Sequence, residues 1–364
     1  MVFIVACHCG YGGLSLAYEW FYPGAFHLAL FAFASGYFYS SKAEKSVGGY
    51  ILKKAKSLLL PMYLWNVFYG VLVTILHTQG FTIGGEITLE NLLLKPLISG
   101  HQFGFNFPTW FVFPLFTVQV FNILFRKVWS IFGKVNEYVV FVIYLIIGFV
   151  GAYLAAEGWN SGWNVHAVRS MYLLPFYTLG TLYKEKLEKH DKLNSLLYFV
   201  ILFILQLLVI VKYDGIYYIT LVWGLGFDKG TVLTPYLVAV LGIAFWLRIS
   251  KLLTPTMKKS KFVMAVADNT FSIMNHHILG FFVLNTGFAL ISKYTGFFQS
   301  FNWESYYSKV QYAFQPRGLA QFKILYLAVG LLFPLGITYA GKFIKKQWNK
   351  YISNKKKMSG ENIA

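Results

Sequence analysis

Long apolar runs separated by short clusters of basic residues dominate this sequence of 364 residues. Hydrophobic residues make up 57% of the chain and charged residues only 13%, which is about half the charged share of a typical soluble domain. A surface so poor in charge would not stay in solution, so we exclude an ordinary soluble enzyme. A polytopic membrane protein is the class that remains.

The length and continuity of the apolar runs predict spanning helices. A helix needs about 20 mostly apolar residues to cross a bilayer, and continuous apolar runs indicate helices, whereas alternating ones indicate a barrel. We expect an all-α transmembrane bundle of about ten spans, forming one domain over 1–345, followed by a basic cytoplasmic tail over 346–364. The ten predicted spans lie near 1–9, 22–40, 57–77, 108–125, 138–156, 170–183, 194–212, 232–248, 270–291 and 321–341.

The net charge of +18 comes from 32 Lys and Arg residues against 14 Asp and Glu residues. Most of these cations fall in one of the two alternating sets of connections between the predicted spans. Such an asymmetry follows the positive-inside rule and predicts that both termini lie on the cytoplasmic side. It also accounts for the positive charge without a nucleic-acid partner, and we expect none.

Histidines are the ionisable residues that stand out among the predicted spans, where polar groups are costly and mark candidate functional sites. His8, His27 and His277 lie within or beside apolar runs, whereas acidic residues are nearly absent there. A histidine can accept a proton near neutral pH and activate a hydroxyl for attack on an acyl group. It can equally be a structural residue that is hydrogen-bonded between helices. Metal-ligand spacing is missing around these histidines, so we expect no metal.

Five segments carry a resemblance to a known family. They are FHLALFAFASGYFYS at 26–40, YILKKAKSLLLPMYLW at 50–65, PTWFVFPLF at 108–116, LLPFYTLGTLY at 173–183 and ADNTFSIMNHH at 267–277. In this order they resemble the bacterial acyltransferase-3 family of integral membrane O-acyltransferases. The resemblance extends over about residues 3–341, which is nearly the whole chain.

The resemblance implies transfer of an acyl group, usually acetyl from acetyl-CoA, to a hydroxyl of a surface carbohydrate at the bacterial inner membrane. FIVACHCG at 3–10 is similar to the family's first-helix histidine motif, which makes His8 the catalytic base or acyl relay. His27 matches the second-helix histidine, and Ser35 with Gly36 matches a small pair that lets helices approach. The residues expected to line the substrate chamber are Ser35, Tyr39, Trp110, Arg169 and His277.

Two of these residues have alternative interpretations. Arg169 would anchor a phosphate or thioester oxygen, but it is equally well explained as a cation reaching the membrane interface. Trp110 offers an aromatic face to a sugar, and an interfacial aromatic belt explains it as well.

The phosphates of CoA favour a basic cytoplasmic surface. Lys53, Lys54, Lys56 and Lys258 are the candidate contacts, although the positive-inside rule alone also explains them. The expected partners are a glycan acceptor and membrane lipid, with self-association left open.

The family generally carries an Arg well before the first-helix histidine, whereas only seven residues precede His8 here. We favour a start that is placed too late over a homologue that has lost half a helix. Two alternatives to an acyltransferase stay open. One is a transporter or flippase for a glycan or lipid, and the other is a catalytically degenerate scaffold of polysaccharide assembly.

Overall fold

The computed structural model describes residues 1–10, 12–14, 19–100, 102–215, 219, 221 and 224–358. Over these residues the chain is built from helices, with no β-strand among them, which confirms the predicted all-α class. The chain divides into two compact units. The small unit comprises Met1–Leu14, Thr256–Tyr306 and Gln311–Ala364, and the large unit comprises Ser15–Pro255 and Tyr307–Val310.

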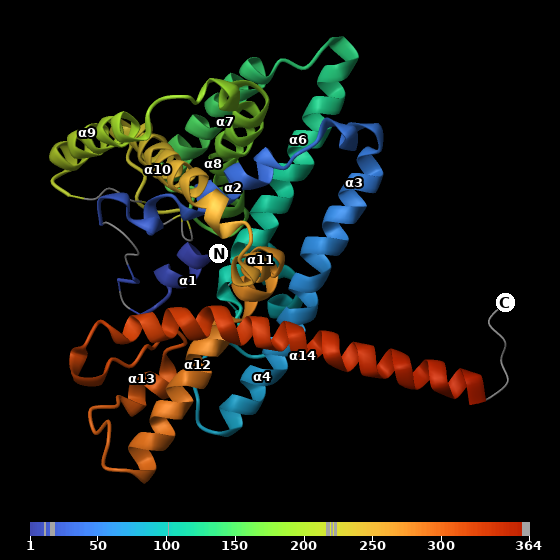
Figure 1. The fold of residues 1–364 in the computed structure, drawn as a ribbon, viewed down its shortest axis with the longest axis vertical. Helices are drawn as coiled ribbons and strands as arrows, with labels where there is room; N and C mark the ends of the chain where they lie inside the picture. The colour runs from blue at the N-terminus through green and yellow to red at the C-terminus, as the bar shows by residue number, and fades with distance from the viewer. Residues whose placement is uncertain are drawn as a thin grey trace. The chain divides into compact units, whose positions relative to one another are not determined.

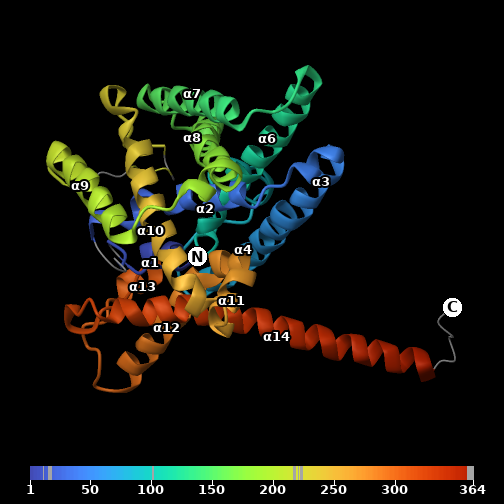
Figure 2. The same ribbon diagram turned by 45° about the horizontal axis from the view of Figure 1, so that its top comes forward.

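The large unit is organised around α8, which packs against α2, α6 and α7. Figures 1 and 2 both show α6, α7 and α8 side by side, with α2 next to α8. Its helices are α2 (His27–Tyr37), α3 (Val47–Lys54), α4 (Leu60–Thr78), α5 (Lys95–Ile98), α6 (Val112–Phe132), α7 (Glu137–Ala156), α8 (Gly162–Leu182), α9 (Ser195–Tyr213) and most of α10 (Thr234–Met257).

The small unit brings the start of the chain against its last long helices. It contains α1 (Val2–Cys7), α11 (Lys261–Asp268), α12 (Thr270–Tyr294), the first part of α13 (Trp303–Ser308) and α14 (Phe322–Met358). A Cβ atom added to Gly330 of α14 would lie 2.6 Å from Val5 and 2.7 Å from Phe281. The missing side chain of Gly330 therefore lets α1 and α12 both approach α14.

Seven helices among the described residues are long and apolar enough to cross a membrane. They are Val47–Thr78, Phe107–Phe132, Glu137–Ala156, Ser195–Tyr213, Thr234–Met257, Thr270–Tyr294 and Phe322–Asn354, and each overlaps a predicted span. These helices and their composition indicate a multi-pass membrane protein.

The other three predicted spans look different in the structure. The helix within 1–9 is α1, with six residues, and the helix within 22–40 is α2, with 11 residues. Both are shorter than the roughly 20 residues that a crossing requires. Residues 170–182 belong to α8, which is 21 residues long but carries His166, Arg169 and Ser170 and so falls outside the apolar set. A count of ten and cytoplasmic termini therefore stay predictions.

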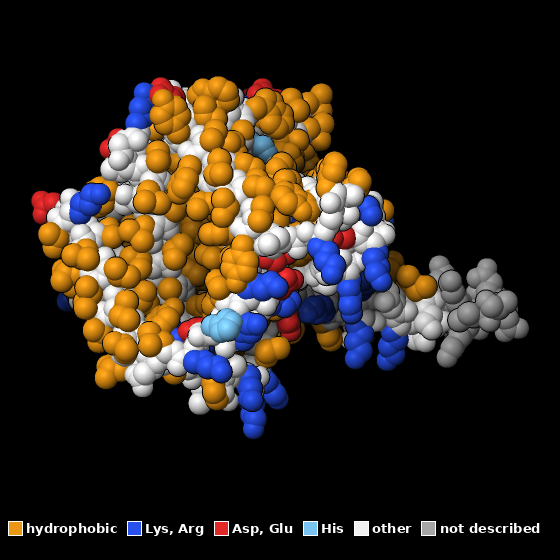
Figure 3. Space-filling model, turned by 90° about the horizontal axis from the view of Figure 1, so that it is seen from above, with side chains coloured by type: hydrophobic (Ala, Val, Ile, Leu, Met, Phe, Trp, Pro, Cys, Tyr) orange, Lys and Arg blue, Asp and Glu red, His pale blue; other side chains and the backbone are white. Residues whose placement is uncertain are grey.

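The helices expose large hydrophobic side chains that a soluble protein would bury. On α9, for example, Leu196 is 76% exposed and Val211 is 72% exposed. Figure 3 shows hydrophobic side chains spread over wide areas of one face. This is the surface expected of helices that contact lipid.

Two glycines bring α2 and α8 into backbone contact. A Cβ atom at Gly36 would lie 1.7 Å from the carbonyl oxygen of Tyr177, and one at Gly180 would lie 2.0 Å from that of Phe33. The hydroxyl of Thr181 donates a hydrogen bond of 3.0 Å to the Gly36 carbonyl across the same crossing. Small residues at such positions are typical of helix pairs in membranes, and the role predicted for Gly36 is confirmed.

An ionic cluster follows α8 in the large unit. Asp191 accepts hydrogen bonds from Tyr183, Lys251 and Arg248, with 3.1 Å between the Lys251 amine and the carboxylate. Burial alone would raise the pKa of Asp191. The Tyr183 and Lys251 hydrogen bonds, together with the charges of Lys251 and Arg248, outweigh burial and hold that pKa below its ordinary value.

The last helix extends through the predicted domain boundary. α14 continues without a break from Phe322 to Met358, so the boundary between 345 and 346 falls inside it. The remaining tail residues, 359–364, lie outside the described residues.

Candidate active site

A glycine-rich turn places His8 at the end of α1. The helix ends at Cys7, and His8 follows as its C-cap residue. Gly10 and Gly13 adopt positive φ angles of 76° and 60°, which glycine reaches without steric cost. The chain thereby folds back on α1, and the amide of Leu14 donates a hydrogen bond of 2.8 Å to the carbonyl of Ala6. This reversal leaves the imidazole of His8 facing α12.

His277 lies in α12 and is fully buried. Its Nδ1 atom is 2.8 Å from the carbonyl oxygen of Ile273, one helical turn earlier. Its ring also packs edge-on against Phe281, with 5.7 Å between the ring centroids. The backbone and the packed ring together fix the orientation of the His277 imidazole.

The two histidines, which are 269 residues apart in sequence, form a direct hydrogen bond. The Nδ1 atom of His8 is 2.8 Å from the Nε2 atom of His277, and the rings lie nearly parallel with centroids 5.0 Å apart. A carbonyl oxygen can only accept, so Nδ1 of His277 must donate to Ile273 and its Nε2 must accept when the ring is neutral. His8 therefore donates from Nδ1.

This hydrogen-bond chain determines which nitrogen of His8 can act as a base. With the proton on Nδ1, the lone pair of a neutral His8 imidazole is on Nε2. His277 and the Ile273 carbonyl also stabilise the imidazolium that forms when Nε2 takes a proton. The arrangement resembles the orienting role of the third member of a catalytic triad, with a neutral histidine in place of the acid.

The remaining predicted histidine and the predicted arginine lie in the large unit. His27 is the first residue of α2, and its Nδ1 donates a hydrogen bond of 2.8 Å to the carbonyl of Pro23. Arg169 lies 4.4 Å above the ring of Trp110, so two of the predicted chamber residues are in contact. Arg169 also donates to the carbonyls of Ile98 and Leu221. These hydrogen bonds tie Ile98, the last residue of α5, and Leu221 to α8.

Ser35 lies near the end of α2 that is far from His27, and Tyr39 lies two residues beyond that end. At 1.5 Å per residue, the last helical residue, Tyr37, is about 15 Å along the helix from His27. The hydroxyl of Tyr39 donates a hydrogen bond of 2.9 Å to Glu44, and its ring lies 5.2 Å from the guanidinium of Arg126. Ser35 is half-buried one residue before the Gly36 crossing. Tyr39 therefore belongs to a polar cluster at one end of the large unit.

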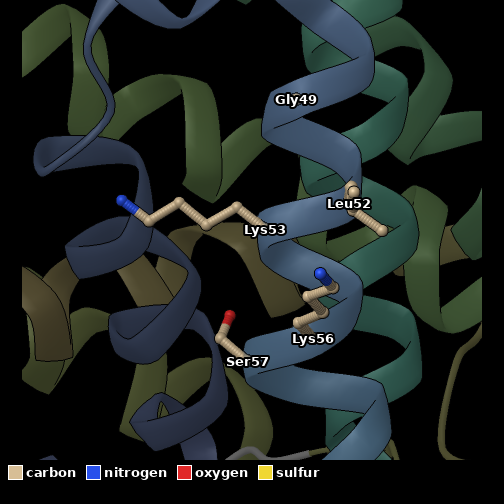
Figure 4. A pocket seen from close by; sticks show the side chains of 5 residues that line it. All are labelled: Gly49, Leu52, Lys53, Lys56 and Ser57. Carbon is tan, nitrogen blue, oxygen red and sulfur yellow. The ribbon is translucent and has the colours of Figure 1, made fainter. Parts of the chain in front are cut away.

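Three of the predicted CoA-binding lysines lie on α3 and the π-turn that follows it. Lys53 and Lys56 line a surface hollow of about 380 Å³ together with Gly49, Leu52 and Ser57. In Figure 4, Lys53 and Ser57 extend to the same side of the helix, as residues four apart must. The amine of Lys54 lies over the ring of Tyr50, 5.4 Å from its centroid. Lys258 is exposed and belongs to the small unit.

Among the described residues, no group of three or more His, Cys, Asp or Glu side chains is arranged to hold a metal ion.

Comparison with known proteins decides the family. The family model described as an acyltransferase domain, of the acyltransferase-3 family, matches residues 1–340. The chain belongs to the acyltransferase-3 family. Searches of curated proteins and of solved structures find no match. Family membership and the apolar helices together indicate a membrane acyltransferase, and the His8–His277 pair lies within the matched region.

Some polar residues of this family member escaped the sequence-based prediction. Arg126 and Glu137 were assigned to connections between spans, yet they form a buried, bidentate ion pair with one contact of 2.7 Å. His166 was placed at a span end or in a loop, yet it is buried in α8. His166 lies four residues before Ser170 and three before Arg169, so the three side chains fall on one face of an apolar helix. This spacing is the signal that would have placed His166 in the interior of the protein.

Proposed function

We propose that this protein is a bacterial inner-membrane O-acyltransferase. Its donor would be acetyl-CoA, and its acceptor a hydroxyl of a cell-surface polysaccharide or a lipid-linked glycan. The observation that carries the proposal is the hydrogen-bond chain from His8 through His277 to the Ile273 carbonyl. A hydrogen-bond chain of this kind orients one imidazole and selects its tautomer, which is what a general base requires.

In the proposed reaction, Nε2 of His8 takes the proton of the acceptor hydroxyl as its oxygen bonds to the thioester carbonyl carbon. The bond between this carbon and the sulfur then breaks, and the CoA thiolate leaves. The imidazolium of His8 returns its proton to the sulfur. The products are an O-acyl ester and CoA thiol, and His8 is regenerated. His277 keeps the His8 proton on Nδ1 throughout and acts as a positioning residue.

The basic hollow on α3 suits the phosphates of the donor. Lys53 and Lys56 supply ammonium donors, and Ser57 supplies a hydroxyl on the same surface. Cationic donors in a shallow, open hollow attract a multiply charged anion and can hold it without burying it. We expect Lys53→Ala with Lys56→Ala to raise the KM for acetyl-CoA several-fold with a smaller effect on kcat. The exposed Lys134 in the α6–α7 connection provides the matched control.

Release of CoA thiol by the purified full chain tests the proposal. The protein in detergent receives acetyl-CoA with and without a glycan extract. We expect acceptor-dependent release that falls about 10²- to 10⁴-fold in His8→Ala, as for loss of a general base. His77 provides the control, because it is also part-buried and hydrogen-bonded to a backbone carbonyl, that of Ile83.

Two outcomes would contradict the proposal. Release that is unchanged in His8→Ala would exclude His8 as the base. If the folded wild-type protein released no CoA with any glycan extract, transport or scaffolding would become the better explanation for this member of the family.

A further inference from the structure

The last helix, α14, is longer than a membrane crossing requires. Its 37 residues extend over about 55 Å at 1.5 Å per residue. A helix tilted by as much as 40° needs only about 40 Å to cross a hydrocarbon core of about 30 Å. The sequence has no charged residue between Lys323 and Lys342, a stretch of about 28 Å that matches the core. A crossing over this stretch ends near Lys342, and the surplus length of α14 follows it.

The second half of α14 is exposed on every side. Just before it, the hydroxyl of Thr338 donates a hydrogen bond of 2.8 Å to that of Ser272 in α12. From residue 339 to residue 354, where the described side chains of this helix end, every residue is exposed. Figures 1 and 2 show this half as an unbroken helix that continues beyond α12. The described part of the small unit therefore leaves this half uncovered.

Large apolar side chains follow one side of this uncovered half. Those at positions i, i+4, i+7 and i+8, which share a helix face, are Ile344, Trp348, Tyr351 and Ile352. Phe343 borders the same face. Ile344 is 65% exposed and Trp348 is 61% exposed. Single exposed apolar residues are ordinary, whereas a continuous apolar face on an uncovered helix marks an interaction surface.

Lysines follow the opposite side of the same half. Those at positions i, i+3, i+4 and i+8 are Lys342, Lys345, Lys346 and Lys350, and all four are exposed. At 100° per residue, the lysine face points roughly 160° away from the apolar face. Residues 342–354 include no Asp or Glu that would offset these charges. The positive-inside rule accounts for the lysines but not for the apolar face behind them.

An apolar face backed by lysines fits the surface of an anionic bilayer. A helix of this kind lies in the plane of the interface, with its apolar face in the boundary between headgroups and acyl chains. Its lysines then reach the headgroup phosphates. A second copy of the same helix fits less well, because two such segments would bring like charges together without acidic residues to pair them.

We propose that residues 342–354 of α14 lie along the membrane interface and bind anionic phospholipid. A helix that crosses the core and then follows the interface must bend between the two parts, and Gly341 lies at this point. Glycine is the weakest helix former after proline, and a Cβ atom at Gly341 would meet nothing within 4 Å, so no packing holds the helix straight there. This surface is separate from the His8–His277 pair and does not depend on acyl transfer.

Hydrogen–deuterium exchange of the full chain in nanodiscs tests the proposal. Discs that hold one chain are made of phosphatidylcholine alone or of phosphatidylcholine mixed with phosphatidylglycerol, which is anionic. A short helix surrounded by water is marginally stable and exchanges fast, whereas one held at the interface is protected. We expect the amides of residues 342–354 to exchange at least about tenfold more slowly in the mixed discs. High salt should reverse this slowing, because it screens the lysines.

A charge variant tests the lysine face. Each lysine near an anionic surface favours binding about fivefold, so Lys346→Gln with Lys350→Gln should weaken binding about 25-fold and remove most of the slowing. Glutamine is a good helix former, so the change in exchange would not come from helix propensity. Lys134→Gln with Lys186→Gln is the control, because both lysines are exposed and lie outside α14. This control should exchange like the wild type.

A second variant tests the apolar face. Ile344→Gln with Trp348→Gln keeps all the lysines and removes two of the largest apolar contacts with the bilayer. Residues 342–354 should then exchange fast in both lipids. Both side chains are exposed, so the substitutions leave the packing of α12 against α14 intact.

Three outcomes would overturn the proposal. The first is equal exchange of residues 342–354 in the two lipids, and the second is full slowing in the charge variant. The third is protection that appears only in discs holding two chains and is independent of phosphatidylglycerol, which would assign the apolar face to a second copy. None of these measurements uses acyl transfer, so this surface and the proposed activity can fail independently.

Discussion

Replacing Gly36 by alanine should separate α2 from α8 and destabilise the large unit. The new Cβ atom would lie 1.7 Å from the carbonyl oxygen of Tyr177, whereas ordinary contacts begin at 3.4 Å. The helices must therefore move apart by roughly 1.7 Å, because backbone faces backbone and no side chain can rotate away. The same movement stretches the hydrogen bond from Thr181 to the Gly36 carbonyl.

The size of the effect follows from three contributions. Overpacking a tight contact costs about 1–3 kcal/mol, and the lost hydrogen bond costs about 1 kcal/mol. Alanine recovers at most about 1 kcal/mol through its higher helix propensity. We therefore expect the free energy of unfolding to fall by about 2 kcal/mol. Gly180→Ala should act in the same way, since its Cβ atom would lie 2.0 Å from the Phe33 carbonyl.

Unfolding by sodium dodecyl sulfate in mixed micelles, followed by tryptophan fluorescence, measures this difference. Gly287→Ala provides the control, because it is also a mid-helix position and nothing lies within 4 Å of its added Cβ atom. That variant should be neutral or slightly more stable. The double variant at Gly36 and Gly180 should lose less than the sum of the single variants, because the first substitution already opens the shared contact. A Gly36→Ala protein as stable as Gly287→Ala would refute the reasoning.

Further predictions concern the charged clusters and the histidine pair. Arg126→Ala or Glu137→Ala alone should lower the free energy of unfolding by about 3–5 kcal/mol in the same measurement, because each leaves a buried charge unpaired. The double variant Arg126→Met with Glu137→Leu should recover most of this loss, because it removes both charges. The contacts that lower the pKa of Asp191 stabilise the fold fully above about pH 4, and this contribution is lost as the pH falls through the lowered pKa. Asp191→Asn should therefore flatten the acid side of a plot of stability against pH, and an unchanged slope would contradict this. In the CoA-release assay, His277→Gln should keep more activity than His277→Ala, because the amide oxygen can still accept from His8, and equal losses would argue against positioning.

The apolar runs of the sequence were enough to predict most of the long helices. Seven predicted spans coincide with helices that are long and apolar enough to cross a membrane. Unpaired backbone N–H and C=O groups are costly in lipid, and a helix pairs them within the segment itself. Hydropathy alone was less informative where helices are short or carry polar residues. α2 has only 11 residues, although the apolar run around it is longer, because Pro23 lies in a separate 3₁₀ turn ahead of it.

Motifs in the sequence placed His8 and His277 among the candidate residues, but their hydrogen bond required the folded chain. The bond joins residues 269 positions apart, and no local pattern encodes a contact over that separation. The same holds for Arg126 and Glu137. Hydropathy assigned both to a connection between spans, and packing makes them a buried pair.

The sequence by itself therefore determined the helical class, the membrane environment and the family, since these depend on composition, periodicity and short motifs. Only the tertiary structure decided which polar groups meet. It set the tautomer of the His8–His277 pair, the backbone contact at Gly36 and the buried ion pair of Arg126 with Glu137. Hydrogen bonds and close packing act over a few ångströms, and only folding brings distant residues within that range.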